Sequence, residues 1–186
     1  MPRISDKRER LLDAAKALIH RRGFGQTTLA HIAEEAEVPL GNVYYYFKTK
    51  DDIARAVIEQ HVDHFREMVR AIEERESDPK GRLEAYVQTH ADMRDNIAEH
   101  GCPVGSLCQE LSKERTALAE TADAVIKAQL KWVTDQFRGM GKKDARDLGL
   151  EFIARLQGLA LLANALKDPD MMARQARRLR QWLAGM

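Results

Sequence analysis

The sequence of 186 residues predicts an all-α fold of about nine helices. Apolar residues recur at intervals of three and four along almost the whole chain, as they do on the buried face of a helix. Runs of alternating β-branched residues, which are typical of strands, do not occur in the sequence. Clusters that contain glycine or proline interrupt the helical pattern at 77–81, 101–103 and 139–141, and therefore mark helix ends.

Three helices are expected in the first 50 residues. The first begins near Asp6, at a pattern that resembles a capping box, and ends at Gly23. Thr28 is the expected N-cap of a short second helix. Pro39 suits the first turn of a third helix, which runs through Tyr46.

A long helix follows, with Thr49 as its cap and Asp52 three positions further on. Its apolar positions continue to Ile72, before the break at 77–81. The later helices are expected near 82–99, 104–112, 115–138, 144–166 and 170–184.

Composition indicates a soluble globular protein. Hydrophobic residues make up 44% of the chain and charged residues 32%, and the mean hydropathy is -0.49. No apolar stretch approaches the ~20 residues of a membrane span, and no apolar signal-peptide block follows the basic N-terminus. Two cysteines are too few for a disulfide framework. We therefore expect a cytoplasmic protein without a membrane partner. Because the net charge is only +1, attraction to a polyanion would depend on where the basic residues are placed.

Residues 24–50 combine two short helices with a tight corner, the arrangement that presents a helix to the major groove of DNA. Val38, Val43 and Phe47 have the spacing expected of residues that face the supporting helices. Gly41 has no side chain, so the start of the second helix could approach DNA closely. Asn42 can both donate to and accept from a base edge.

Three successive tyrosines, Tyr44 to Tyr46, lie near the end of this motif. Successive positions of a helix turn by about 100°, so the three rings cannot share one face. At least one of them is expected in the core.

The strings TTLAHIAEEA at 27–36 and VPLGNVYYYFKTK at 38–50 resemble the N-terminal domain of the TetR family of transcriptional regulators. The resemblance implies a helix-turn-helix DNA-binding domain at 1–50 and a larger helical domain at 51–186 for ligand binding and dimerisation. It implies a homodimeric repressor that a small-molecule effector releases from a near-palindromic operator of double-stranded DNA. Such a protein is not an enzyme and needs no cofactor.

The same resemblance implies which side chains meet DNA. Tyr44 and Lys50 look like phosphate contacts, and Lys50 stands in the first turn of a helix, where N–H groups attract anions. Thr27 and Thr28 look like further contacts to the DNA backbone. The whole predicted DNA-contacting set is Thr27, Thr28, Leu40, Gly41, Asn42, Tyr44, Tyr45, Lys48 and Lys50.

Two residues depart from the family pattern. Glu37 stands in the turn between the two helices, where the family often has glycine. A left-handed backbone there would cost Glu on the order of 1 kcal/mol. Pro39 stands where a Ser or Thr cap is common, so a phosphate-binding hydroxyl is missing at this position.

A dimer of such proteins needs its own surface, and an apolar, helically spaced segment near the C-terminus could provide it as a four-helix interface. The predicted interface residues are Phe152, Leu156, Leu159, Ala160, Ala163, Leu179 and Trp182. The alternative is that this face packs inside one subunit.

Between these ends lies the region that encloses an effector pocket in similar proteins. The candidate pocket residues are Phe65, Met68, Tyr86, His90, Met93, Cys102, Leu107, Leu111 and Leu130. The alternative is that most of them belong to the hydrophobic core.

Cysteine and histidine leave further alternatives. Cys102, just before an expected helix, could be a redox or electrophile sensor, and its axial distance from Cys108 disfavours a disulfide. A DNA-binding protein without a small-molecule effector is the other alternative. His61 and His64 share a helix face without an evident third metal ligand, so we expect a solvated face and no metal.

Overall fold

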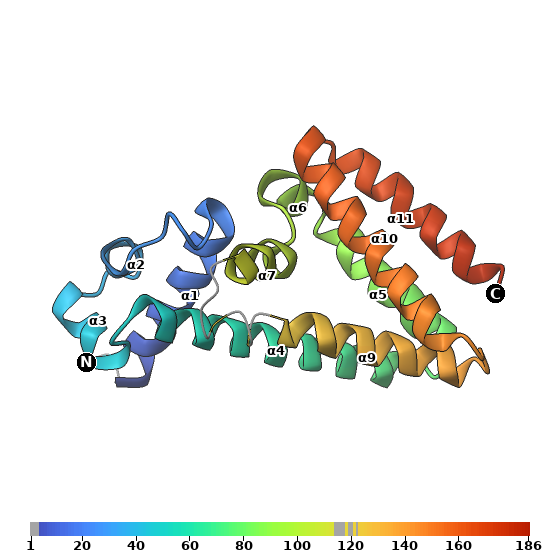
Figure 1. Cartoon of the computed structure of the whole chain (residues 1–186), viewed down its shortest axis with the longest axis horizontal. Coiled ribbons are helices and arrows are strands. Elements are labelled where there is room, and N and C mark those ends of the chain that lie inside the picture. Colours follow the sequence, from blue (N-terminus) through green and yellow to red (C-terminus); the bar gives the residue numbers. More distant parts are fainter. Residues whose placement is uncertain (1–3, 114–117, 119–120, 122) are drawn as a thin grey trace. The chain divides into compact units, whose positions relative to one another are not determined.

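The computed structural model describes residues 4–113, 118, 121 and 123–186, and every regular element in these ranges is a helix (Figure 1). The all-α prediction is therefore confirmed. The helices are α1 (Ile4–Arg22), α2 (Leu29–Glu35), α3 (Leu40–Tyr46), α4 (Lys50–Arg75), α5 (Pro79–Asp92), α6 (Arg94–His100), α7 (Pro103–Lys113), α9 (Ala124–Gly139), α10 (Ala145–Leu166) and α11 (Pro169–Ala184).

The predicted helix ends are correct where a glycine or a hydroxyl cap defines them. Gly23 follows α1 with a φ of 84°, a backbone angle that glycine adopts easily. Thr28 caps α2, because its side-chain oxygen accepts from the His31 N–H. Thr49 and Asp52 form the reciprocal bonds of a capping box at the start of α4: the Asp52 N–H donates to Thr49 Oγ1 at 3.1 Å, and the Thr49 N–H donates to Asp52 Oδ2 at 2.9 Å.

Other expected boundaries differ from the structure. α1 begins at Ile4, so Asp6 lies in its first turn and does not cap it. The helix expected at 82–99 is divided at Met93 into α5 and α6. The start of the helix expected at 115–138 falls largely on residues that the structure does not describe, and α9 covers its later part.

The chain forms two compact units. Unit 1 contains the described residues of 1–62 and 106–124, and unit 2 contains 63–105 and 125–186. Unit 1 therefore also contains residues beyond position 50, among them the first part of α4. Both α4 and α7 begin in one unit and end in the other.

Unit 1 is built on apolar side chains that recur at helical intervals. α1 packs on α2, and α2 packs on α3. Solvent is fully excluded from core residues of all four helices α1 to α4, among them Leu11, Ala15, Ile32, Val43, Ile53 and Val57. This core fixes the orientation of α3, which is too short to be stable alone.

Unit 2 has an aromatic core. Tyr86 of α5, Phe137 of α9 and Phe152 of α10 are almost completely buried, and α5, α10 and α11 pack against one another. The Tyr86 and Phe152 rings are stacked with centroids 6.2 Å apart, and the Phe137 and Phe152 rings meet edge to face at 6.2 Å.

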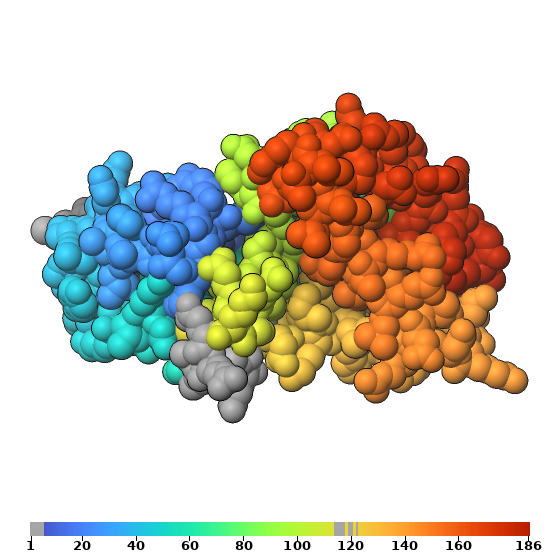
Figure 2. Space-filling model, turned by 45° about the horizontal axis from the view of Figure 1, so that its top comes forward, coloured from blue at the N-terminus to red at the C-terminus, as the bar shows by residue number. Residues whose placement is uncertain are grey.

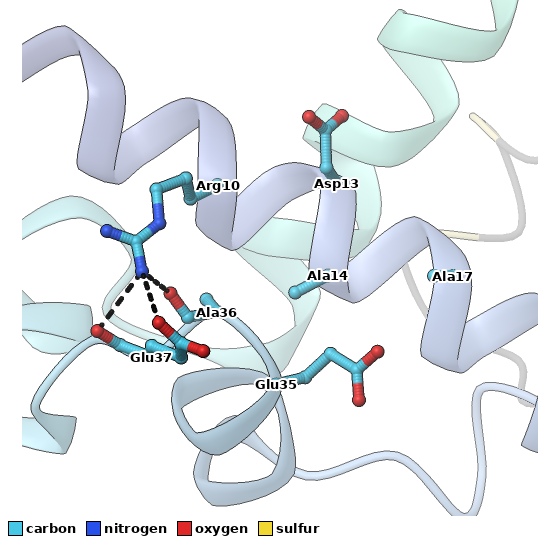
Figure 3. A pocket seen from close by; sticks show the side chains of 7 residues that line it. All are labelled: Arg10, Asp13, Ala14, Ala17, Glu35, Ala36 and Glu37. Atoms are coloured by element: carbon cyan, nitrogen blue, oxygen red, sulfur yellow. Dashed lines mark hydrogen bonds and ion pairs between the residues drawn. The ribbon is translucent and has the colours of Figure 1, made fainter.

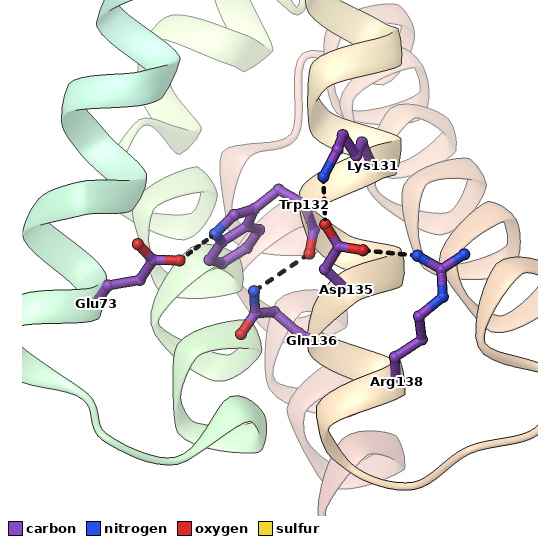
Figure 4. A network of polar contacts seen from close by, with 6 residues as sticks. All are labelled: Glu73, Lys131, Trp132, Asp135, Gln136 and Arg138. Atoms are coloured by element: carbon purple, nitrogen blue, oxygen red, sulfur yellow. Dashed lines mark hydrogen bonds and ion pairs between the residues drawn. The ribbon is translucent and has the colours of Figure 1, made fainter.

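α9 runs beside the second half of α4 (Figure 4). Trp132 of α9 bridges them, because its Nε1–H donates to Glu73 Oε1 at 2.9 Å. On the neighbouring face of α9, Asp135 pairs with Lys131 at 2.6 Å and Arg138 at 2.7 Å, and these bonds lower the pKa of the Asp135 carboxyl. No helix of the described residues is long and apolar enough to cross a bilayer.

Candidate nucleic-acid interface

The corner between α2 and α3 has a left-handed residue at Glu37, whose φ is 51°. Arg10 of α1 holds this corner, because its guanidinium donates to the carbonyl oxygens of Ala36 and Glu37 (Figure 3). The same guanidinium lies 3.7 Å from the Glu37 carboxylate, which is largely exposed. The corner is therefore stabilised by bonds to its backbone, which do not depend on the side chain at position 37.

The inner face of α3 follows the predicted pattern. Val38, Val43 and Phe47 are buried in unit 1, at exposures of 5%, 0% and 3%. Tyr46 is half-buried and packs edge-on against Tyr45, with ring centroids 5.0 Å apart. The expectation that one of the three tyrosines lies in the core was therefore wrong, because none of them is fully buried.

The outer face of α3 carries an unusual amount of exposed apolar and aromatic surface. Leu40 is 41% exposed, Tyr44 48% and Tyr45 72%. A Cβ atom built on Gly41 would meet nothing within 4 Å, so packing inside the protein does not require a glycine there. Asn42 lies in the same stretch and is half-buried. Large side chains held in solvent around a bare backbone position are what a helix that enters a groove requires.

Two lysines flank the exposed face of α3. Lys48 is exposed, and its Nζ donates to the Tyr44 carbonyl at 2.7 Å. Lys50, the first residue of α4, places its Nζ 4.0 Å from the centroid of the Phe24 ring and donates to the Gly25 carbonyl at 3.3 Å. Both ammonium groups are thus anchored within unit 1.

The two threonines of the predicted contact set differ in orientation. Thr28 is exposed at the start of α2. Thr27 is only 1% exposed, and its hydroxyl donates to the Gly23 carbonyl at 2.8 Å. The Thr27 side chain therefore closes the turn after α1 and is directed into the subunit. The apolar pattern gave no indication of this, because a threonine suits either position.

The predicted dimer residues lie mainly inside their own subunit. Phe152, Leu156, Ala160, Ala163 and Leu179 are at most 3% exposed, as the alternative of packing within one subunit anticipated. Leu159 and Trp182 are half-buried.

We did not predict from the sequence a second apolar face of α10, which points away from the buried core of unit 2. Leu150, Leu161, Leu162 and Leu166 are 46%, 66%, 50% and 65% exposed. A groove of about 420 Å³ adjoins this face between α10 and α11, and is lined by Ala154, Arg155, Gly158, Leu159, Leu162, Gln175, Arg178 and Leu179. The two helices, orange and red, lie side by side at the surface in Figure 2. The sequence held one sign of this face: the leucines in the run 159–162 cover more than one side of a helix.

Four of the predicted pocket residues meet in unit 2. The Tyr86 ring lies 6.1 Å from the Phe65 ring and 4.8 Å from the His90 ring, and Met68 packs against the same core. Trp132, which sequence reasoning missed, joins them at 5.5 Å from Tyr86 and 6.4 Å from Phe65. Partial burial lowers the pKa of His90, although its Nδ1 lies 3.0 Å from the Tyr86 carbonyl oxygen.

The other pocket candidates are dispersed. Leu107 and Leu111 are buried in unit 1, whereas Met93 is 44% exposed at the junction of α5 and α6. Leu130 lines a shallow surface groove together with basic residues of α9 and α10.

Phe65, Tyr86, His90 and Trp132 form the aromatic group of unit 2, and Cys102 lies near Tyr86 of this group. Its sulfur accepts the Gly105 N–H at 3.3 Å, at the start of α7, and the thiol is free and half-buried. The pKa of the Tyr86 hydroxyl is raised, mainly by burial and to a smaller extent by the nearby Cys102. Cys108 is also half-buried.

The two histidines of α4 do not share an environment. His61 is 7% exposed and therefore buried, contrary to the expected solvated face, while His64 is exposed. Among the described residues no three His, Cys, Asp or Glu side chains converge in a way that could hold a metal ion.

The fold and the exposed face of α3 define a helix-turn-helix protein that binds DNA. Residues 11–57 match the model of bacterial regulatory proteins of the tetR family, and residues 79–178 match that of the LmrA/YxaF-like transcriptional regulator C-terminal domain. The chain belongs to the TetR family of transcriptional regulators, with a C-terminal domain of the LmrA/YxaF-like type.

Relatives and solved structures agree with this assignment. An uncharacterised HTH-type transcriptional regulator from Lactococcus lactis is 25% identical over 91% of this chain and 89% of its own. The HTH-type transcriptional repressor NemR of Escherichia coli is 31% identical over 62% of this chain and 57% of its own. The crystal structure of the TetR-family regulator SCO4454 from Streptomyces coelicolor has the same fold, with a TM-score of 0.86, 21% identity, and coverage of 96% and 94% of the two chains.

Proposed function

We propose that this regulator is a repressor whose α3 enters the major groove of a near-palindromic operator. The observation that carries the proposal is the outer face of α3, where Leu40, Tyr44 and Tyr45 stand in solvent around the unobstructed Gly41. Asn42 reads a base edge, and Lys48, Lys50 and Thr28 contact the phosphate backbone. Repression is supported by NemR, which is described as a repressor.

Selection of genomic fragments with the purified protein tests this function. We expect the bound fragments to share a near-palindromic sequence with half-sites about 34 to 36 Å apart, or a multiple of one turn. Bound fragments that are recovered only in proportion to their abundance, with no shared sequence, would contradict the proposal.

The proposed repressor acts as a homodimer, because one short recognition helix contacts too few base pairs to select an operator. We assign the dimer contact to the exposed leucines of α10 and the adjoining groove beside α11. Leucine surface of this kind is usually covered in a stable assembly. Phe152 and Leu156, which the sequence predicted at the interface, are buried in the core of unit 2.

The proposed effector is a small molecule bound beside the aromatic group of unit 2. Phe65, Tyr86 and Trp132 present ring edges and faces to one another, and His90 adds a polar group whose pKa is lowered by burial. An effector that prefers the non-binding state by about 1 to 3 kcal/mol would weaken operator binding roughly 5- to 150-fold.

Tryptophan fluorescence tests the location of the effector. In a Trp182→Phe variant, Trp132 is the remaining tryptophan. A compound that releases the operator should change the Trp132 emission at the same concentration. Release without any change in Trp132 emission would exclude this site.

A thiol sensor is the second candidate function, and the position of Cys102 favours it. Its sulfur receives an N–H from the first turn of α7 and lies in the same unit as the aromatic group. If this candidate is correct, an electrophile such as N-ethylmaleimide will release DNA from the wild type and from Cys108→Ser but not from Cys102→Ser. Unaltered release from Cys102→Ser would eliminate it.

A further inference from the structure

The turn that follows α1 is held from two sides by charged residues. Gly25 donates its N–H to Glu110 Oε2 of α7 at 3.1 Å, and its carbonyl accepts from Lys50 Nζ of α4 at 3.3 Å. All three residues belong to unit 1. A single glycine therefore connects a carboxylate of α7 to one of the proposed phosphate contacts.

Glu110 also fits closely against the preceding part of this turn. A Cβ atom built on Gly23 would lie 2.8 Å from Glu110 Oε1, and Gly23 has a left-handed φ of 84°. The carboxylate therefore occupies space that a side chain at position 23 would need. Glu110 is half-buried there, and its helix is anchored by Leu107 and Leu111, which are 3% and 0% exposed.

The Phe24–Gly25 turn also positions the Lys50 ammonium group. Phe24, between the two glycines, is 2% exposed, and the Lys50 ammonium group lies over its ring. Lys50 has three N–H donors, so its bond to the Gly25 carbonyl leaves donors for a phosphate. Movement of the Phe24–Gly25 turn would remove both the cation–π contact and the carbonyl that orient this ammonium group.

We propose that Glu110 of α7 is a positioning residue for operator binding, which holds the Phe24–Gly25 turn and thereby keeps Lys50 in place for a DNA phosphate. This inference rests on the proposed function and extends it to a residue outside the helix-turn-helix. α7 begins in unit 2, at Pro103, so the helix that carries Glu110 is continuous with the chain of that unit.

Glu110 variants distinguish positioning from simple electrostatics. As an acid in the DNA-binding unit, Glu110 repels phosphate, so its charge alone predicts tighter DNA binding by both Glu110→Ala and Glu110→Gln. Positioning predicts that Glu110→Ala weakens operator binding roughly 2- to 10-fold, the effect of losing one hydrogen bond. Glu110→Gln, whose carbonyl can still accept the Gly25 N–H, retains binding close to that of the wild type. Gln109→Ala, at an exposed position of the same helix, is the matched control.

Two further measurements test whether Glu110 acts through the Gly25 turn and Lys50. Hydrogen exchange of the Gly25 amide, followed by NMR without DNA, should be faster in Glu110→Ala than in Glu110→Gln or Gln109→Ala. In a Lys50→Ala background, Glu110→Ala should cause no further loss of operator affinity, because the residue through which it acts is gone.

The outcomes separate this inference from the proposed function. If the wild type selects no operator, the proposed function fails and this inference fails with it. If the wild type binds its operator but Glu110→Ala binds as well or better, or loses affinity equally with and without Lys50, the positioning role alone is overturned.

Discussion

At the scale of single residues, two glycine positions of the motif illustrate opposite constraints. Gly23 is needed by the protein itself, because its φ is positive and Glu110 fills the space beside it. Gly41 lies in a helix with open space around it. A glycine that destabilises a helix and relieves no internal crowding is best explained by close approach of another molecule.

Replacing Gly41 with alanine should therefore separate stability from function. We expect Gly41→Ala to raise the free energy of unfolding by about 0.5 to 1 kcal/mol, because alanine favours the helix, and to weaken operator binding by obstructing close approach. Urea unfolding and operator titration measure the two effects. A variant that is both more stable and fully active would show that DNA does not approach this position.

Two non-glycine residues with positive φ in the described part of the chain allow a second paired prediction. Glu37 has a φ of 51° and Lys167 a φ of 52°. Glu37→Gly should stabilise the protein by on the order of 0.5 to 1 kcal/mol, because it relieves the left-handed strain and loses only an exposed ion pair. Lys167→Gly should stabilise it less or destabilise it, because Lys167 Nζ donates to the Glu99 carbonyl at 2.8 Å at the end of α6. Equal changes in the urea midpoint would contradict this explanation.

At the scale of helices, hydroxyl and glycine caps were predictable, and the interruption at Met93 was not. Thr28, Thr49 and Gly23 act through their own backbone neighbours, so their roles follow from local sequence. Met93 has neither the rigidity of proline nor the freedom of glycine, and apolar spacing continues across it. α6 packs against α10 and α11, which lie far away in the sequence, so nothing in the local sequence indicated that break.

The cap of α4 leads to a prediction about pH. The hydroxyl and N–H of Thr49 lower the pKa of Asp52 below its ordinary value of 3.8. Since the folded state favours the charged carboxylate, its stabilising contribution is present above pH 3.8 and is lost as the pH falls through the lowered pKa. Asp52→Ala should lower the urea midpoint at neutral pH and converge with the wild type in strong acid. A constant difference between the two proteins at every pH would exclude this charge-dependent cap.

α10 shows why the proposed dimer surface was harder to predict than a core. Apolar residues occur on both of its faces, so periodicity alone could not tell Leu156, which is 1% exposed, from Leu161, which is 66% exposed. Burial within one subunit makes the distinction and moves the proposed interface to the outer leucines.

Charge placed on that outer face should disrupt the dimer. We expect Leu161→Glu to dissociate it into folded monomers, because the new carboxylate would be buried without a partner at the interface. Sedimentation velocity measures the state, and Ala71→Glu, at an exposed position of α4, is the control. Persistence of the Leu161→Glu dimer would place the interface elsewhere.

At the scale of the whole molecule, the motif at 24–50 allowed the DNA-binding function to be predicted, while the effector region remained largely undetermined. The motif is local and its geometry is defined by a few side chains in sequence order. The candidate pocket residues come from distant helices, and the structure divides them between two units: Phe65 and Tyr86 lie in unit 2, and Leu107 and Leu111 in unit 1. Trp132 could be recognised as their neighbour only once α9 was placed beside α4.

The outer face of α3 is proposed to read the operator, while the lysines beside it bind phosphate. The most direct test compares affinities for the selected operator and for random DNA over a range of salt concentrations. We expect Asn42→Ala to lose about 1 to 3 kcal/mol of discrimination between the two DNAs. Lys50→Ala should weaken binding to both DNAs and reduce the salt dependence by roughly one phosphate contact per subunit. Affinity and salt dependence that remain at wild-type values in both variants would contradict the claim.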